Sequence, residues 1–165
     1  MILKNYMIAK ERLLNGTVSG AITMLENYTD MGGTERSGEY GNYAPLGSAL
    51  AACVGTGDTA PTATDYALDA DASASFSNLT LSAATRAIAI DENGKPYISH
   101  THTISGVNSS GASVTVKEFG IYYKNWHYAS GSYYCDLLFA REVLPEPIIV
   151  TAGDSFSLPI DWREY

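Results

Sequence analysis

Apolar and polar residues alternate along much of the chain after residue 47, with the period of two that is typical of β-strands. In the clearest segment every second residue is large and apolar: Phe156, Leu158, Ile160 and Trp162. The same pattern, or a short apolar run between turn residues, predicts strands over 17–25, 48–54, 76–83, 85–90, 97–104, 114–123, 133–143 and 148–151.

Turn residues separate these strands. Asn93-Gly94 predicts a β-hairpin with a type I′ turn, in which both central residues take a positive φ. Further turns are expected at 108–111 and at Gly153-Asp154. Pro159 cannot donate a main-chain hydrogen bond, so the last strand is expected at a sheet edge or with its free side toward solvent.

The segment 114–123 changes phase in its middle. Val114 and Val116 lie on one predicted face, whereas the apolar residues after Lys117-Glu118 lie on the other, which predicts a β-bulge there. Glu118 and Arg141 are charged residues inside otherwise apolar strands. We expect them to form an ion pair across the sheet in a structural role.

The first third of the chain is less regular. Residues 1–14 suit a short helix ended by Asn15-Gly16, and an extended arm that pairs with another chain is the alternative. A glycine-rich loop is expected at 29–47, and one helical turn at 65–68. The predicted organisation is therefore an N-terminal arm or helix over 1–16, followed by a single domain over 17–165.

Short strands with turns every 8–12 residues or so, and hardly any helical period, predict an all-β fold. The expected architecture is an antiparallel β-sandwich, jelly-roll or immunoglobulin-like, with a barrel as the alternative. The length of 165 residues and the hydrophobic content of 45% fit one packed core.

Charge and composition narrow the classes of partner. The formal net charge is −8 and the basic residues are scattered, which argues against a nucleic-acid partner. No apolar run approaches the roughly 18 residues of a membrane helix, and the charged N-terminus does not resemble a secretory signal peptide. Cys53 and Cys135 are therefore expected to be reduced, buried thiols, although one disulfide between them stays an alternative.

Three sequence motifs resemble parts of known ligand-binding sites. Residues 54–60 contain G-x-G-x-x-A, but a Pro61-containing loop follows instead of a helix, so we interpret it as a glycine turn. His100 and His102 project from one strand face and are weak zinc candidates, with His127 as a possible third ligand. The alternative places this histidine pair on a half-buried or interface face.

An EF-hand-like start at Asp69-x-Asp71-x-Ser73 fails at the sixth position, Ala74, and at the twelfth, Thr80. An irregular calcium loop stays an alternative, because the chain has an acidic stretch here, formed by Asp58, Asp65, Asp69 and Asp71. No G-x-S-x-G elbow or catalytic cysteine context occurs, and no carboxylate pair is singled out among the 18 acidic residues. The sequence therefore predicts neither an enzyme nor a cofactor.

A concentration of aromatic residues brackets a Gly/Ser turn. Such side chains combine contact area with a polar edge and suit protein interfaces or sugar stacking; packing in the sandwich core is the alternative. The candidate interface or ligand residues are Tyr122, Tyr123, Trp126, His127, Tyr128, Tyr133 and Tyr134.

Three segments resemble sequence motifs of small β-sandwich virion structural proteins of tailed bacteriophages. They are 54–68 (VGTGDTAPTATDYAL), 114–123 (VTVKEFGIYY) and 138–143 (LFAREV) followed by 149–154 (IVTAGD). They lie within the last two-thirds of the chain, and no match is identified in the first third.

The resemblance implies a non-enzymatic, multi-copy tail, neck or fibre-type component, with a capsid decoration protein or a glycan- or receptor-binding module as alternatives. It implies assembly in the host cytoplasm into a virion. The implied partners are other virion proteins (capsid, portal, neck or tail) and further copies of the chain. In that setting residues 1–14 and 29–44 are the expected docking segments, because an arm can become ordered on its partner.

Overall fold

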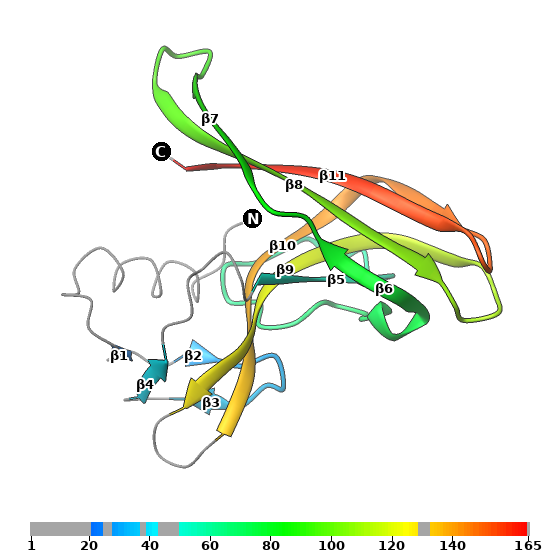
Figure 1. Cartoon of the computed structure of the whole chain (residues 1–165), viewed down its shortest axis with the longest axis horizontal. Helices are drawn as coiled ribbons and strands as arrows, with labels where there is room; N and C mark the ends of the chain where they lie inside the picture. Colours follow the sequence, from blue (N-terminus) through cyan, green and yellow to red (C-terminus); the bar gives the residue numbers. More distant parts are fainter. Residues whose placement is uncertain (1–20, 25–27, 37–38, 43–49, 129–132, 165) are drawn as a thin grey trace. The chain divides into compact units, whose positions relative to one another are not determined.

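A computed structural model describes residues 21–24, 28–36, 39–42, 50–128 and 133–164 (Figure 1). The chain divides into two compact units, one formed by 1–74 with 115–149 and the other by 75–114 with 150–165. The strands of both units pair antiparallel, which confirms the all-β antiparallel class. The predicted single domain over 17–165 stays a prediction, and the predicted arm or helix over 1–16 lies outside the described residues.

The first unit contains a three-stranded sheet in the order β10-β9-β5. Its strands are β5 (Leu50–Gly55), β9 (Val114–Tyr128) and β10 (Tyr133–Val150). Four short strands form two further pairs, β1 (Ala21–Met24) with β4 (Glu39–Asn42) and β2 (Tyr28–Thr29) with β3 (Glu35–Arg36). The region 29–47, predicted as a loop, therefore contains β3 and β4.

A small apolar cluster of Cys53, Leu68 and Leu138 lies on this sheet, with Met31 and Tyr122 packed against it. Gly120 lets the side chains of Leu138 and Cys53 pack close to the main chain of β9. A Cβ at this position would lie 2.7 Å from Leu138 Cδ1 and 2.8 Å from Cys53 Sγ. The Cys53 thiol is free and buried, as predicted. Cys135 lies on β10, and its side chain is outside the described part.

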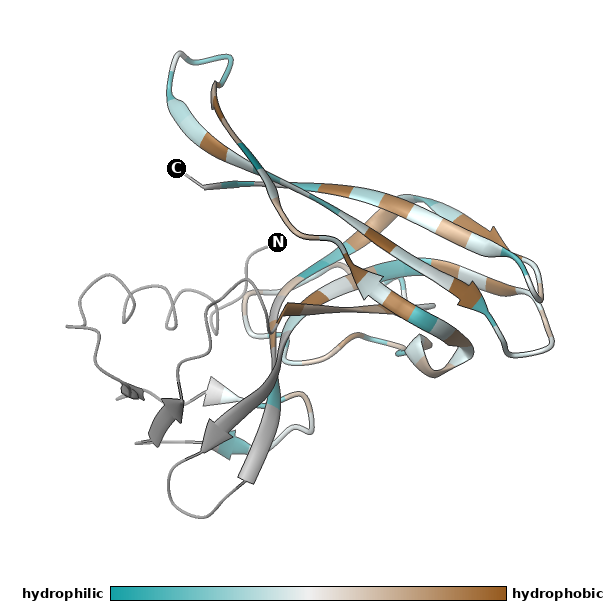
Figure 2. Cartoon of the chain, in the orientation of Figure 1, coloured by the Kyte–Doolittle hydropathy of each residue, from teal (hydrophilic) through white to brown (hydrophobic). Residues whose placement is uncertain are grey.

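The second unit is built around β8 (Pro96–Asn108). β11 (Ser155–Glu164) pairs along one side of β8, while β6 (Phe76–Leu81) and β7 (Thr85–Ile90) pair in succession along the other. Hydropathy alternates visibly along β11 (Figure 2). Ile104, Phe156 and Ile160 are buried on the same face, and the rings of Phe76 and Phe156 meet edge to face at 5.1 Å.

Pro159 behaves as its chemistry predicts. Its register partner Thr103 directs its own N–H and C=O to Ser82, away from β11. Pro159 and Thr103 are therefore a non-hydrogen-bonded pair, in which the nitrogen of Pro159 faces the free side of β11. Within the described residues β11 pairs only with β8, so the predicted edge position is confirmed.

The β7–β8 hairpin is present, but its turn is not type I′. Gly94 has φ +78°, whereas Asn93 is not among the described residues with a positive φ. Gly94 N–H donates to the Asp91 carbonyl. Asp91 N–H donates to the Lys95 carbonyl at 3.0 Å, and this hydrogen bond closes the loop. The Asp91 carboxylate accepts the N–H groups of Asn93 and Lys95, which stabilises a three-residue loop ending in a left-handed glycine.

The bulge predicted near Lys117-Glu118 does not occur in the pairing of β9 with β5. The β5–β9 register is continuous from Leu50↔Tyr123 to Gly55↔Glu118. Val116, Glu118 and Gly120 are all buried and share one face. The apparent phase change arises because both faces of β9 are buried here. The carboxylate of Glu118 follows Val116 on one face, and Ile121 is buried on the other.

Two smaller expectations also differ. Strands predicted separately at 133–143 and 148–151 are one strand, β10, which passes through Pro145 and Pro147. The predicted helical turn at 65–68 is absent, and the only helix among the described residues is the 3₁₀ turn Ser73–Ser75. Asp65 accepts hydrogen bonds from the main chain and hydroxyl of Thr62, which forms a non-helical turn instead.

Candidate functional site

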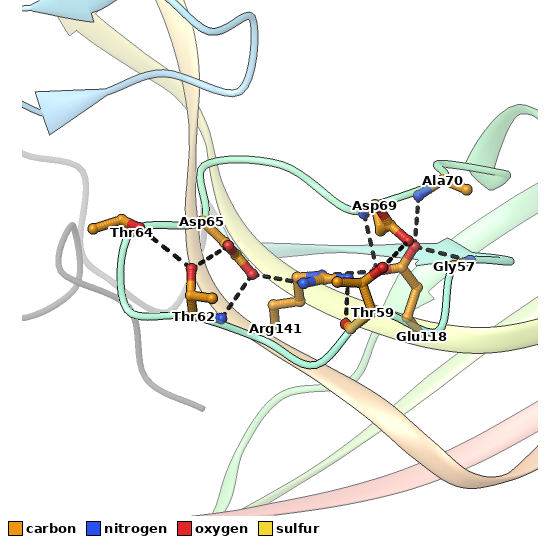
Figure 3. A network of polar contacts seen from close by, with 9 residues as sticks. All are labelled: Gly57, Thr59, Thr62, Thr64, Asp65, Asp69, Ala70, Glu118 and Arg141. Atoms are coloured by element: carbon orange, nitrogen blue, oxygen red, sulfur yellow. Dashed lines mark hydrogen bonds and ion pairs between the residues drawn. The ribbon is translucent and has the colours of Figure 1, made fainter.

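The loop 56–72, between β5 and β6, is fastened to the first unit's sheet by a buried ion pair (Figure 3). Arg141 Nε donates to Glu118 Oε2 at 2.8 Å, and the two side chains are 3% and 0% exposed. β9 supplies the carboxylate and β10 the guanidinium, so the ion pair predicted across the sheet is confirmed. We call this pair, with the groups that bond to it, the loop clamp.

Glu118 accepts hydrogen bonds from three main-chain N–H groups of the loop in addition to Arg141. Its Oε1 accepts from Gly57 at 3.2 Å and Ala70 at 2.8 Å, and its Oε2 accepts from Asp69 at 3.1 Å. A carboxylate offers about four lone-pair sites, so this acceptor is saturated. Saturation compensates the loss of water around a buried charge and holds both ends of the loop at once.

Arg141 extends the clamp to the middle of the loop. Its Nη1 donates to Asp65 Oδ2 at 2.6 Å, and its Nη2 donates to the Thr59 carbonyl at 3.0 Å. Asp65 is itself held by Thr62, as described above. One guanidinium therefore connects two carboxylates and a main-chain carbonyl, a use of its planar set of donors that lysine could not reproduce.

The G-x-G of the apparent dinucleotide motif belongs to this clamp. A Cβ on Gly55 would lie 2.5 Å from Glu118 Oε1 and 2.6 Å from the Ala70 carbonyl. A Cβ on Gly57 would lie 2.6 Å from the same carboxylate oxygen and 2.5 Å from Asp69 Cβ. The interpretation as a glycine turn gains a physical reason, because the glycines make room for a buried carboxylate.

Electrostatics agree with this geometry. Partial burial alone would raise the pKa of Asp65, but hydrogen bonds from Thr62 and Arg141 leave that pKa below its usual value. Burial would lower the pKa of Arg141, and its ion pairs with Glu118 and Asp65 raise it instead. Burial, reinforced by nearby carboxylates, strongly raises the pKa of the Cys53 thiol, which is therefore a packing residue and a poor nucleophile.

The other residues of the acidic stretch bond within the loop or to the residues beside it, Ser73 and Lys117. Asp69 Oδ2 accepts from the Thr59 hydroxyl at 2.9 Å. Asp71 Oδ1 accepts from both the main chain and the hydroxyl of Ser73. Asp58 pairs with Lys117 at the surface, at 2.9 Å. These contacts account for the spacing that resembled a calcium loop.

His100 and His102 are both buried on one face of β8, as the strand period predicts. His102 Nδ1 lies 2.9 Å from the Ser82 carbonyl, a hydrogen bond that fixes the ring. Within the described part of the chain no three His, Cys, Asp or Glu side chains are grouped as a metal site. The histidine pair is thus placed in the buried face of its sheet.

The aromatic candidates are only partly described. Tyr122 is half-buried against the cluster of Cys53, Leu68 and Leu138. The main chains of Tyr123, Trp126, His127 and Tyr128 lie in β9, and those of Tyr133 and Tyr134 lie in β10. The side chains of these six residues lie outside the described part, so their interface role stays a prediction.

Sequence reasoning placed Asp65 only among possible calcium ligands and assigned no bonding role to Asn108. Asn108 is 1% exposed, and its amide donates to the carbonyls of Ala112 and Val150 at 2.7 Å and 2.8 Å. Its Oδ1 accepts from Ser110. A polar residue at the inward position of a strand, just before a turn, was the available signal; Asp65 offered no signal except its Thr-x-x-Asp spacing.

Comparisons with protein-family models, with curated proteins and with solved structures found no match. No helix in the described part of the chain is both long and apolar enough to span a membrane.

Proposed function

We propose that this chain is a non-enzymatic structural component of a tailed-bacteriophage virion, present in many copies in the tail, neck or a fibre. The fold we propose within the all-β class is a jelly-roll or immunoglobulin-like sandwich. The loop clamp is the observation that carries the proposal, because it connects the sequence resemblance to the three-dimensional structure.

Each of the three resembling segments supplies a different part of the clamp. Segment 54–68 is most of the loop, 114–123 contains Glu118, and 138–143 contains Arg141. The bonded residues of these segments are separated by 23 to 82 positions along the chain, yet they meet in one hydrogen-bonded network. Segments that form one physical unit support a resemblance to a whole module rather than to three unrelated phrases.

The chemistry of the clamp suits assembly. Its charged groups are committed to one another and to main-chain N–H groups, so the clamp makes the loop rigid. Residues 62–64 of this loop are exposed. A surface that is already ordered pays little conformational entropy when a neighbour binds, which favours a component used repeatedly in a large assembly.

Copy number in purified particles tests the proposal. Labelled reference peptides of this chain and of the major capsid protein would be quantified together by mass spectrometry, with an abundant host protein as the control for contamination. We expect a copy number that matches a three-, six- or twelve-fold assembly, as tail and neck components have.

Hundreds of copies per particle would overturn the tail, neck or fibre assignment and identify a capsid decoration protein. A signal no higher than that of the host protein would overturn the virion proposal altogether.

A further inference from the structure

Strand β7 presents an apolar edge to solvent. Ile88 and Ile90 are 84% and 69% exposed, and Ile98, which pairs with Ile88 across the hairpin, is 40% exposed. Among the residues that the structure describes, β7 pairs only with β8, so its other side is open. An apolar, unpaired strand edge of this kind is a site for the addition of another strand.

The register shows which main-chain groups face this edge. Asp91 N–H donates to the Lys95 carbonyl, so the main-chain N–H and C=O groups of Asp91 face β8. Main-chain groups alternate in direction along an antiparallel strand, and therefore the main-chain groups of Ala87 and Ala89 also face β8. The N–H and C=O groups of Arg86, Ile88 and Ile90 then point outward.

The opposite edge of the same sheet is protected. Pro159 faces the free side of β11 and offers no N–H there, and Asp161 and Arg163 place charges along the same edge strand. Proline and charged residues are common devices against strand addition. By contrast, β7 contains no proline and only one charged residue, Arg86.

We propose that a second copy of this chain binds here, with β7 antiparallel to the partner's β7 about a two-fold axis at Ile88. The proposal extends beyond the proposed virion role and does not depend on it. Because the same surface is used twice, the contact closes as a dimer and does not propagate into a filament.

Hydrogen-bond complementarity determines this register. With Ile88 opposite its own copy, Arg86 lies opposite the second copy's Ile90, and each outward residue meets an outward residue. Each such pair exchanges two main-chain bonds, about six in all. Any other register that keeps the same faces aligned leaves some of these groups unpaired.

Side chains also favour a second copy as the occupant. Ile98 and Ile88 of both copies would form one continuous row of isoleucines across the interface. The opposite face carries Ala87 and Ala89, which are small enough for close strand approach. Arg86 would lie diagonal to Glu92 of the second copy, within reach of its long side chain, and both residues are exposed.

Sedimentation equilibrium of the full chain and of Ile88→Lys, over a range of concentrations, tests the proposal. We expect a dimer in the parent chain, and a dissociation constant raised at least about tenfold by two lysines opposed at the axis. Ile149→Lys is the matched control, because Ile149 is 72% exposed on β10, and it should dimerise like the parent. A monomeric parent chain, or any oligomer that Ile88→Lys leaves unchanged, would overturn the proposal.

A cross-linking experiment keeps the proposal falsifiable if Ile88→Lys does not fold. In the proposed register the two Cα atoms at position 88 would be about 5.5 Å apart, within disulfide range. Ile88→Cys, oxidised with glutathione disulfide, should therefore give a covalent dimer, whereas Ile149→Cys should give only the parent background. Equal cross-linking of the two variants would contradict the register.

Discussion

Glu118 and Arg141 form the ion pair on which the position of the loop 56–72 depends. Removing one partner leaves the other charge buried without its counter-charge, a loss of about 3–5 kcal/mol. We therefore expect Arg141→Met to lower the free energy of unfolding in urea by about that amount. Lys117→Met is the control, because the exposed Lys117–Asp58 pair should contribute less than about 1 kcal/mol.

Equal stabilities of Arg141→Met and Lys117→Met would show that the buried pair is not the main support of the loop. Coupling provides a second check on the same pair. The double variant Glu118→Gln/Arg141→Met should lose less stability than the two single variants added together, because neither charge is then left alone.

Gly57 tests the close packing around the same carboxylate. Alanine would place its Cβ 2.6 Å from Glu118 Oε1 and 2.5 Å from Asp69 Cβ, so the loop must shift. We expect Gly57→Ala to cost about 1–3 kcal/mol in urea unfolding. Thr56→Ala, at the exposed position beside it, should change stability by about 0.5 kcal/mol or less. If the two variants are equally stable, the glycine is not required for space.

Asp65 should make the free energy of unfolding depend on pH in the acidic range. Its pKa is lowered in the folded state, so its contribution is present above the unfolded value, about 3.9, and is lost as pH falls through the folded value. The stability difference between the parent chain and Asp65→Asn should therefore be constant at neutral pH and shrink below about pH 4.

Asp58→Asn is the comparison for Asp65. Hydrogen bonding to Lys117 also lowers the pKa of Asp58, but that pair is exposed and screened by water and salt. Its pH-dependent difference should be much smaller and should fade in high salt. A pH profile for Asp65→Asn parallel to that of the parent chain would rule out the proposed linkage.

At the scale of elements, the β7–β8 hairpin depends on the side chain of Asp91. Asp91→Ala removes the acceptor for two main-chain N–H groups, those of Asn93 and Lys95. We expect faster amide hydrogen exchange at Ala87 and Ala89, corresponding to about 1–2 kcal/mol of lost local stability. Glu92→Ala alters the exposed neighbour in the turn and should leave this exchange unchanged. Equal protection in both variants would mean that Gly94 alone determines the turn.

The elements themselves were largely predictable. The segments 85–90 and 155–162 were recognised from alternation and are strands in the structure. The hairpin was also predicted, but its turn type was not. Asn-Gly favours type I′, whereas here the Asp91 carboxylate stabilises a type I turn followed by a left-handed glycine. Competition between two local motifs decided the geometry, and the dipeptide alone did not show it.

At the scale of the whole molecule, the net charge of −8 governs how copies of the chain meet in solution. Repulsion between copies should vanish near the isoelectric point, which the composition places at about 4.7. We expect light scattering at constant protein concentration to rise as pH falls from 7 toward that value and to fall again below it. Circular dichroism at each pH would separate association from unfolding, and scattering independent of pH would contradict a charge-controlled surface.

The sequence by itself determined the all-β class, most of the strands and the pairing of Glu118 with Arg141. Each of these follows from a local physical rule: strand residues alternate between faces, and an unpaired charge is costly in an apolar strand. Only the tertiary structure decided the roles of Asp65 and Gly57, because their partners lie on strands far along the chain. It also decided that Glu118 points inward without a bulge, since a carboxylate can take a core position only where four donors converge on it.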